Sequence, residues 1–144
     1  MKKLQFRQSE NAQQRSRNMR AIKSRSNKTT ELRLRALLMR YRIKGWKLHP
    51  NSVPGAPDFL LEKLRVAIFV DGCFWHGCPR CGHVPKTNRA YWAAKITRNK
   101  SRDLRVTRKL REQGFRVLRI WECQLRISPE KCVSRILRCS KGRK

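Results

Sequence analysis

Three stretches of this chain carry apolar residues at every third or fourth position, which is the spacing of one face of an amphipathic helix. They span residues 29–45, 88–113 and 128–139, and a break in the second is expected near Asn99. The residues expected to face a core are Leu34, Leu37, Leu38, Tyr41, Trp92, Ile96, Leu104, Leu110, Val133, Ile136 and Leu137. Glycines at 45 and 114 and the sequence Ser128-Pro129-Glu130 supply the expected stop and start signals.

Four shorter stretches have the composition of β-strands. Residues 46–49 predict a short strand, and the prolines of the segment 50–57 force a loop after it. Residues 58–61 and 64–70 predict two strands joined by a turn, the second apolar almost throughout as in a strand buried on both faces. Residues 115–121 add a fourth. Helices on either side of a small mixed sheet make an α/β domain.

The charge of the chain then points to a polyanionic partner. Thirty-seven Lys and Arg against nine Asp and Glu leave a formal net charge of +28. Such an excess repels itself in the compact state, and DNA or RNA would relieve the repulsion. No apolar run is long enough to cross a membrane, and no apolar segment follows the basic first residues as in a signal peptide. We therefore expect a single domain that works in the cytoplasm.

The basic residues also suggest a division of the chain. Residues 1–28 are polar and basic, with Met19 in a small apolar group, and predict an arm that contacts nucleic acid. Residues 29–139 carry the predicted helices and strands and form the expected domain. Residues 140–144 are a short basic tail.

Closely spaced thiols indicate a metal site directly after the buried strand. Cys73, Cys78 and Cys81 have the spacing Cys-x4-Cys-x2-Cys, and zinc prefers sulfur and nitrogen ligands. Cys123 is the best candidate for the fourth ligand, because the strand before it could lie beside the buried strand. His83 could replace a thiol, whereas Cys132 and Cys139 are expected to be small core residues.

Carboxylates and a histidine lie around the same strands. If the strands pair, Asp58 and Asp71 converge at one end of the sheet, where their oxygens would suit Mg²⁺; the alternative is that each caps a turn. His76 has the chemistry of a general acid or base, but zinc ligation or stacking on Trp75 would also explain it. His49 is interpreted as an ordinary residue at a strand end.

Phe74 and Trp75 are adjacent, so they cannot both point into one core. In a basic loop, one or both could wedge between bases, as apolar side chains do in proteins that kink DNA. The alternative is a hydrophobic plug over the zinc.

Four segments, in this order, resemble the very-short-patch repair endonucleases. They are Asn18-Met19-Arg20-Ala21-Ile22, Pro54-Gly55-Ala56-Pro57-Asp58-Phe59, Phe69-Val70-Asp71-Gly72-Cys73-Phe74-Trp75-His76 and Trp121-Glu122-Cys123. The resemblance covers about residues 15–137. It implies a restriction-endonuclease-like fold, a mixed central sheet flanked by helices, with a structural zinc. It also implies nicking 5′ of the thymine in a T:G mismatch, the lesion left when 5-methylcytosine deaminates.

The resemblance also implies roles for single residues. Asp58 would bind Mg²⁺ with help from the backbone carbonyl of Val70, and His76 would activate the attacking water. Asp103 would orient that histidine, and Glu31 would have a supporting role. The expected zinc ligands are Cys73, Cys78, Cys81 and Cys123. The expected intercalating side chains are Phe74, Trp75 and Trp92 from the major groove and Met19 from the minor groove.

One departure from the family pattern concerns Asp71. A relative has threonine and histidine where this chain has Val70 and Asp71, and that histidine is thought to assist catalysis. Asp71 could instead join Asp58 on the metal.

The sequence therefore predicts a zinc-stabilised, magnesium-dependent mismatch endonuclease. The alternatives are a restriction-type nuclease of the same fold that cuts both strands and a non-enzymatic zinc module that binds nucleic acid. The expected partners are T:G-mismatched DNA, an associated cytosine-5 DNA methyltransferase and mismatch-repair proteins. The protein is expected to be a monomer associated with a bacterial nucleoid.

Overall fold

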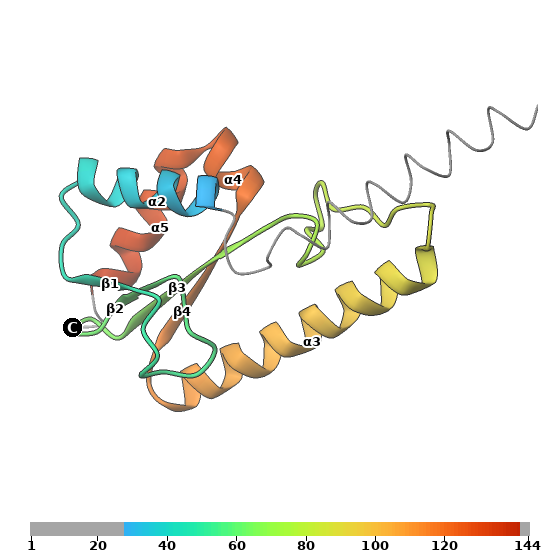
Figure 1. Cartoon of the computed structure of the whole chain (residues 1–144). Helices are drawn as coiled ribbons and strands as arrows, with labels where there is room; N and C mark the ends of the chain where they lie inside the picture. The colour runs from blue at the N-terminus through green and yellow to red at the C-terminus, as the bar shows by residue number, and fades with distance from the viewer. Residues whose placement is uncertain (1–27, 142–144) are drawn as a thin grey trace, which may run out of the picture.

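The computed structural model describes residues 28–141, and its centre is a four-stranded mixed sheet (Figure 1). The strands are β1 (Trp46–Leu48), β2 (Phe59–Leu61), β3 (Val66–Asp71) and β4 (Arg116–Trp121), in the order β1-β2-β3-β4. The first two pairings are antiparallel, and β3 pairs with β4 in parallel. The mixed sheet flanked by helices confirms the predicted fold class.

Helices cover both faces of this sheet. A parallel pair needs a crossover connection, and α3 (Arg89–Glu112) supplies it between β3 and β4. α2 (Lys28–Arg40), α4 (Glu122–Ile127) and α5 (Pro129–Ser140) lie on the opposite side from α3 (Figure 1). None of these helices has the length and apolar character required to cross a membrane.

The alternation of side chains along the strands gives each layer its own core. Phe59, Leu61, Val66, Ile68, Leu118 and Ile120 pack with Leu34 and Leu38 of α2 and Ile136 of α5. Residues of opposite parity, Leu60, Ala67 and Phe69, pack with Leu110 of α3 and with Phe115. Because strand side chains alternate between faces, Asp71 and Arg119 share the α3 side with Phe69.

Several expectations about the helices are wrong in detail. Leu104 of α3 is 69% exposed, because it lies off the helix face that carries the buried residues Trp92, Ile96 and Leu110. Leu137 is 37% exposed, and Tyr41 lies one residue past the end of α2 and is exposed. The helix is also continuous at Asn99, whose side chain donates to the carbonyl of Trp75 instead of ending the helix.

Candidate functional site

A first group of polar side chains surrounds Asp58, at the entrance to β2. The antiparallel register that pairs Leu48 with Phe59 continues for one more step, and the His49 amide donates to the Asp58 carbonyl over 3.1 Å. The His49 ring then lies beside Asp58, with Nδ1 3.9 Å from Oδ1. Glu31 of α2 approaches the same ring, with Oε1 2.8 Å from Nε2. One ligand atom from each of these three residues lies within 4.8 Å of the others.

The Asp58 carboxylate is held in an environment that disfavours its charge. Its Oδ2 accepts a 2.7 Å hydrogen bond from the backbone N–H of Val70 at the end of β3. Burial nevertheless raises the pKa of Asp58 from 3.8 to about 6, and the negative charges of Glu31 and Asp71 add to the rise. A cation beside Asp58 would remove this penalty, so the site fits a metal ion.

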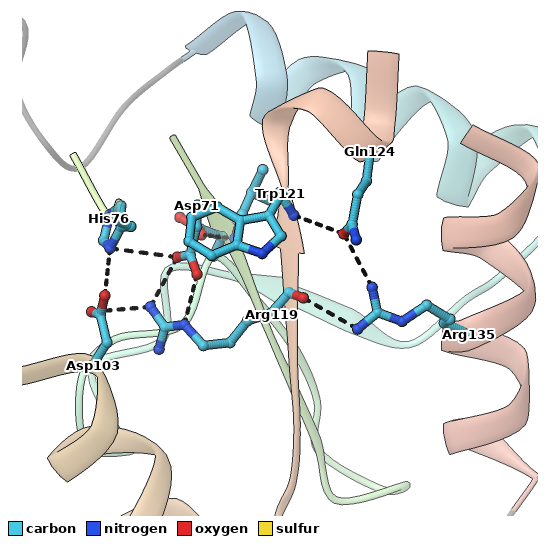
Figure 2. Close-up of polar contacts among 9 residues, drawn as sticks. Asp71, His76, Asp103, Arg119, Trp121, Gln124 and Arg135 are labelled. Carbon is cyan, nitrogen blue, oxygen red and sulfur yellow. Dashed lines mark hydrogen bonds and ion pairs between the residues drawn. The ribbon is translucent and has the colours of Figure 1, made fainter. Parts of the chain in front are cut away.

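A second group centres on His76, in the loop after β3. Nδ1 of His76 lies 2.6 Å from Oδ2 of Asp103, which α3 contributes, and 3.8 Å from Oδ1 of Asp71 (Figure 2). The ring is 11% exposed. With Nδ1 facing a carboxylate, Nε2 is the ring nitrogen suited to take a proton from water. The contact brings Asp103 to the histidine, and the role of Asp103 in orienting the ring stays a prediction.

Arg119 joins the two acids of this second group. It donates from Nε to Asp71 Oδ2 over 2.7 Å and from Nη2 to Asp71 Oδ1 over 2.8 Å (Figure 2). The same Nη2 lies 3.0 Å from Oδ1 of Asp103. The guanidinium also packs on the Phe69 ring, with Cζ 4.5 Å from the centroid. Such bidentate pairing fixes the orientation of a carboxylate as well as its charge.

Asp71 is placed differently from the expectation that it joins Asp58 on a metal. Asp71 is only 3% exposed, and both of its carboxylate oxygens face Arg119. Within the described residues, the groups that accompany Asp58 as possible ligands are Glu31 and His49. Asp71 remains between the two groups, since it contacts His76 and its charge raises the pKa of Asp58.

The four cysteines predicted to bind zinc converge. Sγ atoms of Cys73, Cys78, Cys81 and Cys123 lie within 4.8 Å of one another, and Cys123 comes from the start of α4. Sγ of Cys78 is 3.8 Å from Sγ of Cys123, and the Cys123 amide donates to Sγ of Cys73. This cluster could hold a tetrahedral metal such as zinc. The parallel pairing of β3 and β4 explains the convergence, because it brings the residues after both strands to one edge.

The pKa values of two thiols in this cluster are shifted in opposite directions. Burial opposes ionisation of Cys78, but hydrogen bonds from the backbone N–H groups of Cys81 and Arg80 outweigh it and lower the pKa to about 7. Burial raises the pKa of Cys73. The backbone of the loop thus stabilises a thiolate at Cys78, the form that binds metal.

Aromatic side chains beside the cysteines form a packed cluster. Phe74 makes edge-to-face contacts with Trp75, His83 and Trp92, at centroid distances of 5.2, 6.0 and 5.3 Å. Trp75 and Trp92 are buried, and the Nζ of Lys95 lies over the Trp75 ring. All three aromatics expected to intercalate therefore pack against one another in this structure. Met19 lies outside the described residues.

Two residues of the site were not found from the sequence. The sequence predicts an ordinary strand-end residue at His49, whereas the antiparallel pairing of the strands before and after the proline loop places it opposite Asp58. Arg119 carries no sequence signal of this role, because an arginine in an alternating strand suggests solvent exposure. Its partners, Asp71 and Asp103, are 48 and 16 residues away in sequence, so no local pattern signals the contact.

Comparison with known proteins gives a consistent result. The family model described as DNA mismatch endonuclease Vsr matches residues 9–81, just over half of the chain. The chain is 43% identical over 114 residues to the DNA mismatch endonuclease Vsr of Escherichia coli K12, covering 78% of this chain and 71% of that protein. It is 44% identical over 112 residues to the type II nicking enzyme V.NaeI of Lentzea aerocolonigenes, covering 75% of this chain and 67% of that protein. The nicking enzyme V.XorIIP of Xanthomonas oryzae is 41% identical over 103 residues.

Proposed function

The chain belongs to the Vsr family of DNA mismatch endonucleases, and we propose that it nicks one strand of a duplex 5′ of the thymine in a T:G mismatch. The observation that carries this proposal is the hydrogen-bonded pair of His76 and Asp103 next to the Asp58 group. A DNA-binding protein gains nothing from buried carboxylates that repel phosphate. A phosphodiester hydrolase needs them to position a base and a cation.

His76 is the proposed general base. Asp103 holds Nδ1, so Nε2 takes the proton from the attacking water, and the carboxylate stabilises the resulting imidazolium. Arg119 keeps Asp103 in place and balances the charge of Asp71, so it is a positioning residue. Asp71 has the same role in this proposal.

The proposed catalytic cation is Mg²⁺, held by Asp58 with the backbone of Val70 beside it and Glu31 close by. When bound, this cation neutralises charge on the phosphate under attack. The raised pKa of Asp58 supports the assignment, because a carboxylate that is costly to ionise gains most from a cation.

Zinc is the proposed occupant of the four-cysteine cluster, where it would brace the loop that carries His76. Metal analysis of the purified protein is expected to give one zinc per chain. Cys123→Ser should lose it, whereas Cys132→Ser, a buried thiol outside the cluster, should retain it.

DNA recognition is proposed to divide between charge and aromatic side chains. Residues 1–28 and the basic tail would hold the phosphate backbone, and the domain itself is residues 29–139. Phe74, Trp75 and Trp92 would enter the duplex from the major groove and Met19 from the minor groove, because a mispaired step costs less to open. The edge-to-face cluster must separate for this to happen.

The proposed activity also suggests where and with which proteins the enzyme acts. We propose that the protein acts as a monomer on nucleoid DNA, with a cytosine-5 DNA methyltransferase creating the sites and mismatch-repair proteins as further partners.

The test uses one duplex sequence in matched and T:G-mismatched form, with Mg²⁺ present. Nicking of only the thymine-containing strand of the T:G duplex supports the proposal. Equal cutting of both duplexes, or cutting of both strands, indicates a restriction-type enzyme. Asp58→Ala is expected to abolish nicking, with Glu62→Ala, an exposed acid just after β2, as the matched control. Full activity of Asp58→Ala would contradict the assigned site.

A further inference from the structure

We infer that Glu31, His49 and Asp58 form a mixed nitrogen and oxygen site that binds a divalent transition cation such as Mn²⁺ in preference to Mg²⁺. The inference deepens the metal site of the proposed function and rests on it. It assigns to His49 a role as a metal ligand.

The convergence of three separate segments supports the site. Glu31 comes from α2, His49 follows β1, and Asp58 precedes β2. His49 lies between the two carboxylates, with Nε2 2.8 Å from Glu31 Oε1 and Nδ1 3.9 Å from Asp58 Oδ1. The backbone hydrogen bond from His49 to Asp58 extends the β1–β2 ladder, so the placement of His49 is built into the sheet.

The spacing is close to that of a coordination shell. Metal–ligand bonds of about 2.1 Å place ligand atoms roughly 3 to 4 Å apart across a shared ion. One atom from each of the three residues lies within 4.8 Å of the others, slightly wider than such a shell, so the side chains would rotate to close on an ion. The His49 ring is 46% exposed and the Asp58 side chain 20%, which leaves room for these rotations and for a phosphate oxygen.

The ligand types decide which ion is favoured. Mg²⁺ prefers an all-oxygen shell of carboxylates, phosphates and water. Imidazole nitrogen adds affinity for first-row transition ions, whereas it adds little for Mg²⁺. Mn²⁺ is the most informative test ion, because it also accepts carboxylates and competes only weakly for thiolates, so the cysteine cluster stays out of the measurement.

The experiment measures Mn²⁺ binding to the zinc-loaded protein without DNA, by electron paramagnetic resonance. The wild-type protein should bind Mn²⁺ more tightly than Mg²⁺, and the bound ion should show ¹⁴N coupling from an imidazole ligand. His49→Gln should lose the ¹⁴N coupling and bind Mn²⁺ at least about ten-fold more weakly. His83→Gln, which removes an exposed imidazole outside this group, should change neither.

The outcomes separate this inference from the proposed function. Absence of ¹⁴N coupling in the wild type, or unchanged Mn²⁺ affinity in His49→Gln, overturns the ligand assignment and leaves mismatch nicking untouched. If ¹⁴N coupling is present but matched and T:G duplexes are cut equally, the metal site holds and the mismatch assignment fails. The wild-type spectrum needs no variant, so the inference stays testable if His49→Gln folds poorly.

Discussion

At the scale of a single residue, the buried charge of the Asp58 carboxylate lowers the stability of the fold. Burial raises its pKa from 3.8 to about 6, so the folded protein binds this proton more tightly than the unfolded chain. Stability from this group is therefore present below pH 3.8 and is lost as pH rises through 6. Without Mg²⁺ at pH 8, Asp58→Asn should increase the free energy of unfolding by about 1–3 kcal/mol.

Urea denaturation at several pH values checks this prediction, without chelators so that the proposed zinc would stay in the cysteine cluster. The increase in the free energy of unfolding caused by Asp58→Asn should shrink below pH 6 and vanish near pH 4. The matched change Glu62→Gln should not stabilise, because Glu62 is exposed and the adjacent Lys47 lowers the pKa of its carboxyl group. A gain in Asp58→Asn that persists at pH 4 would contradict the electrostatic explanation.

The pair of Arg119 and Asp71 belongs to the same scale. Arg119→Met should leave the buried Asp71 carboxylate without its bidentate partner and cost about 3–5 kcal/mol of stability. The double variant with Asp71→Asn should recover most of that loss, because the buried Asp71 charge is gone and Asp103 keeps its hydrogen bond to His76. Chemical denaturation of the wild type, the two single variants and the double variant gives the coupling free energy between the two residues. Simple additivity of the two changes would show that the pair is not an energetic unit.

At the scale of elements, the loop before Asp58 fixes the distance between α3 and the sheet. Gly55 has a φ of +76°, and a Cβ there would lie 2.2 Å from Cγ1 of Val106 on α3. Gly55→Ala should therefore cost more than the about 1 kcal/mol expected for a positive φ alone. Gly45→Ala is the matched control, since Gly45 has a φ of +80° and no atom within 4 Å of such a Cβ.

Thermal or urea unfolding of these variants separates the two effects. Gly55→Ala should lose about 2–4 kcal/mol, and adding Val106→Ala should recover part of the loss. Equal costs at Gly45 and Gly55 would show that only backbone conformation matters, and that α3 moves freely relative to the loop.

Elements also show which parts of the structure a sequence can predict. The strands and the three closely spaced thiols were predictable because periodicity and short thiol spacing are local signals, whereas Cys123 required the expected pairing of its strand with the buried strand. Leu104 is exposed although it is expected to face inward, because the approximate apolar repeat of α3 does not separate it from the buried face of Trp92, Ile96 and Leu110. His49 and Arg119 were missed for a related reason: their partners are set by strand register, and register depends on contacts between distant segments.

At the scale of the whole molecule, the formal net charge of +28 should dominate DNA affinity and leave mismatch preference unaffected. Each phosphate contact releases counterions, so affinity for a matched duplex should fall by about 10³ or more between 50 and 200 mM salt if six or more contacts form. Insertion of Phe74, Trp75 or Trp92 into the duplex releases no counterions, because these side chains are uncharged.

The ratio of T:G to matched affinity should therefore stay nearly constant as salt rises. Fluorescence anisotropy with both duplexes, without divalent cations so that no strand is cut, measures the two slopes. If the logarithm of affinity falls with the logarithm of salt concentration at the same slope for both duplexes, charge holds the DNA and aromatic contacts recognise the mismatch. A preference that collapses with salt would instead place mismatch recognition in the basic residues and remove the reason for the aromatic cluster to open.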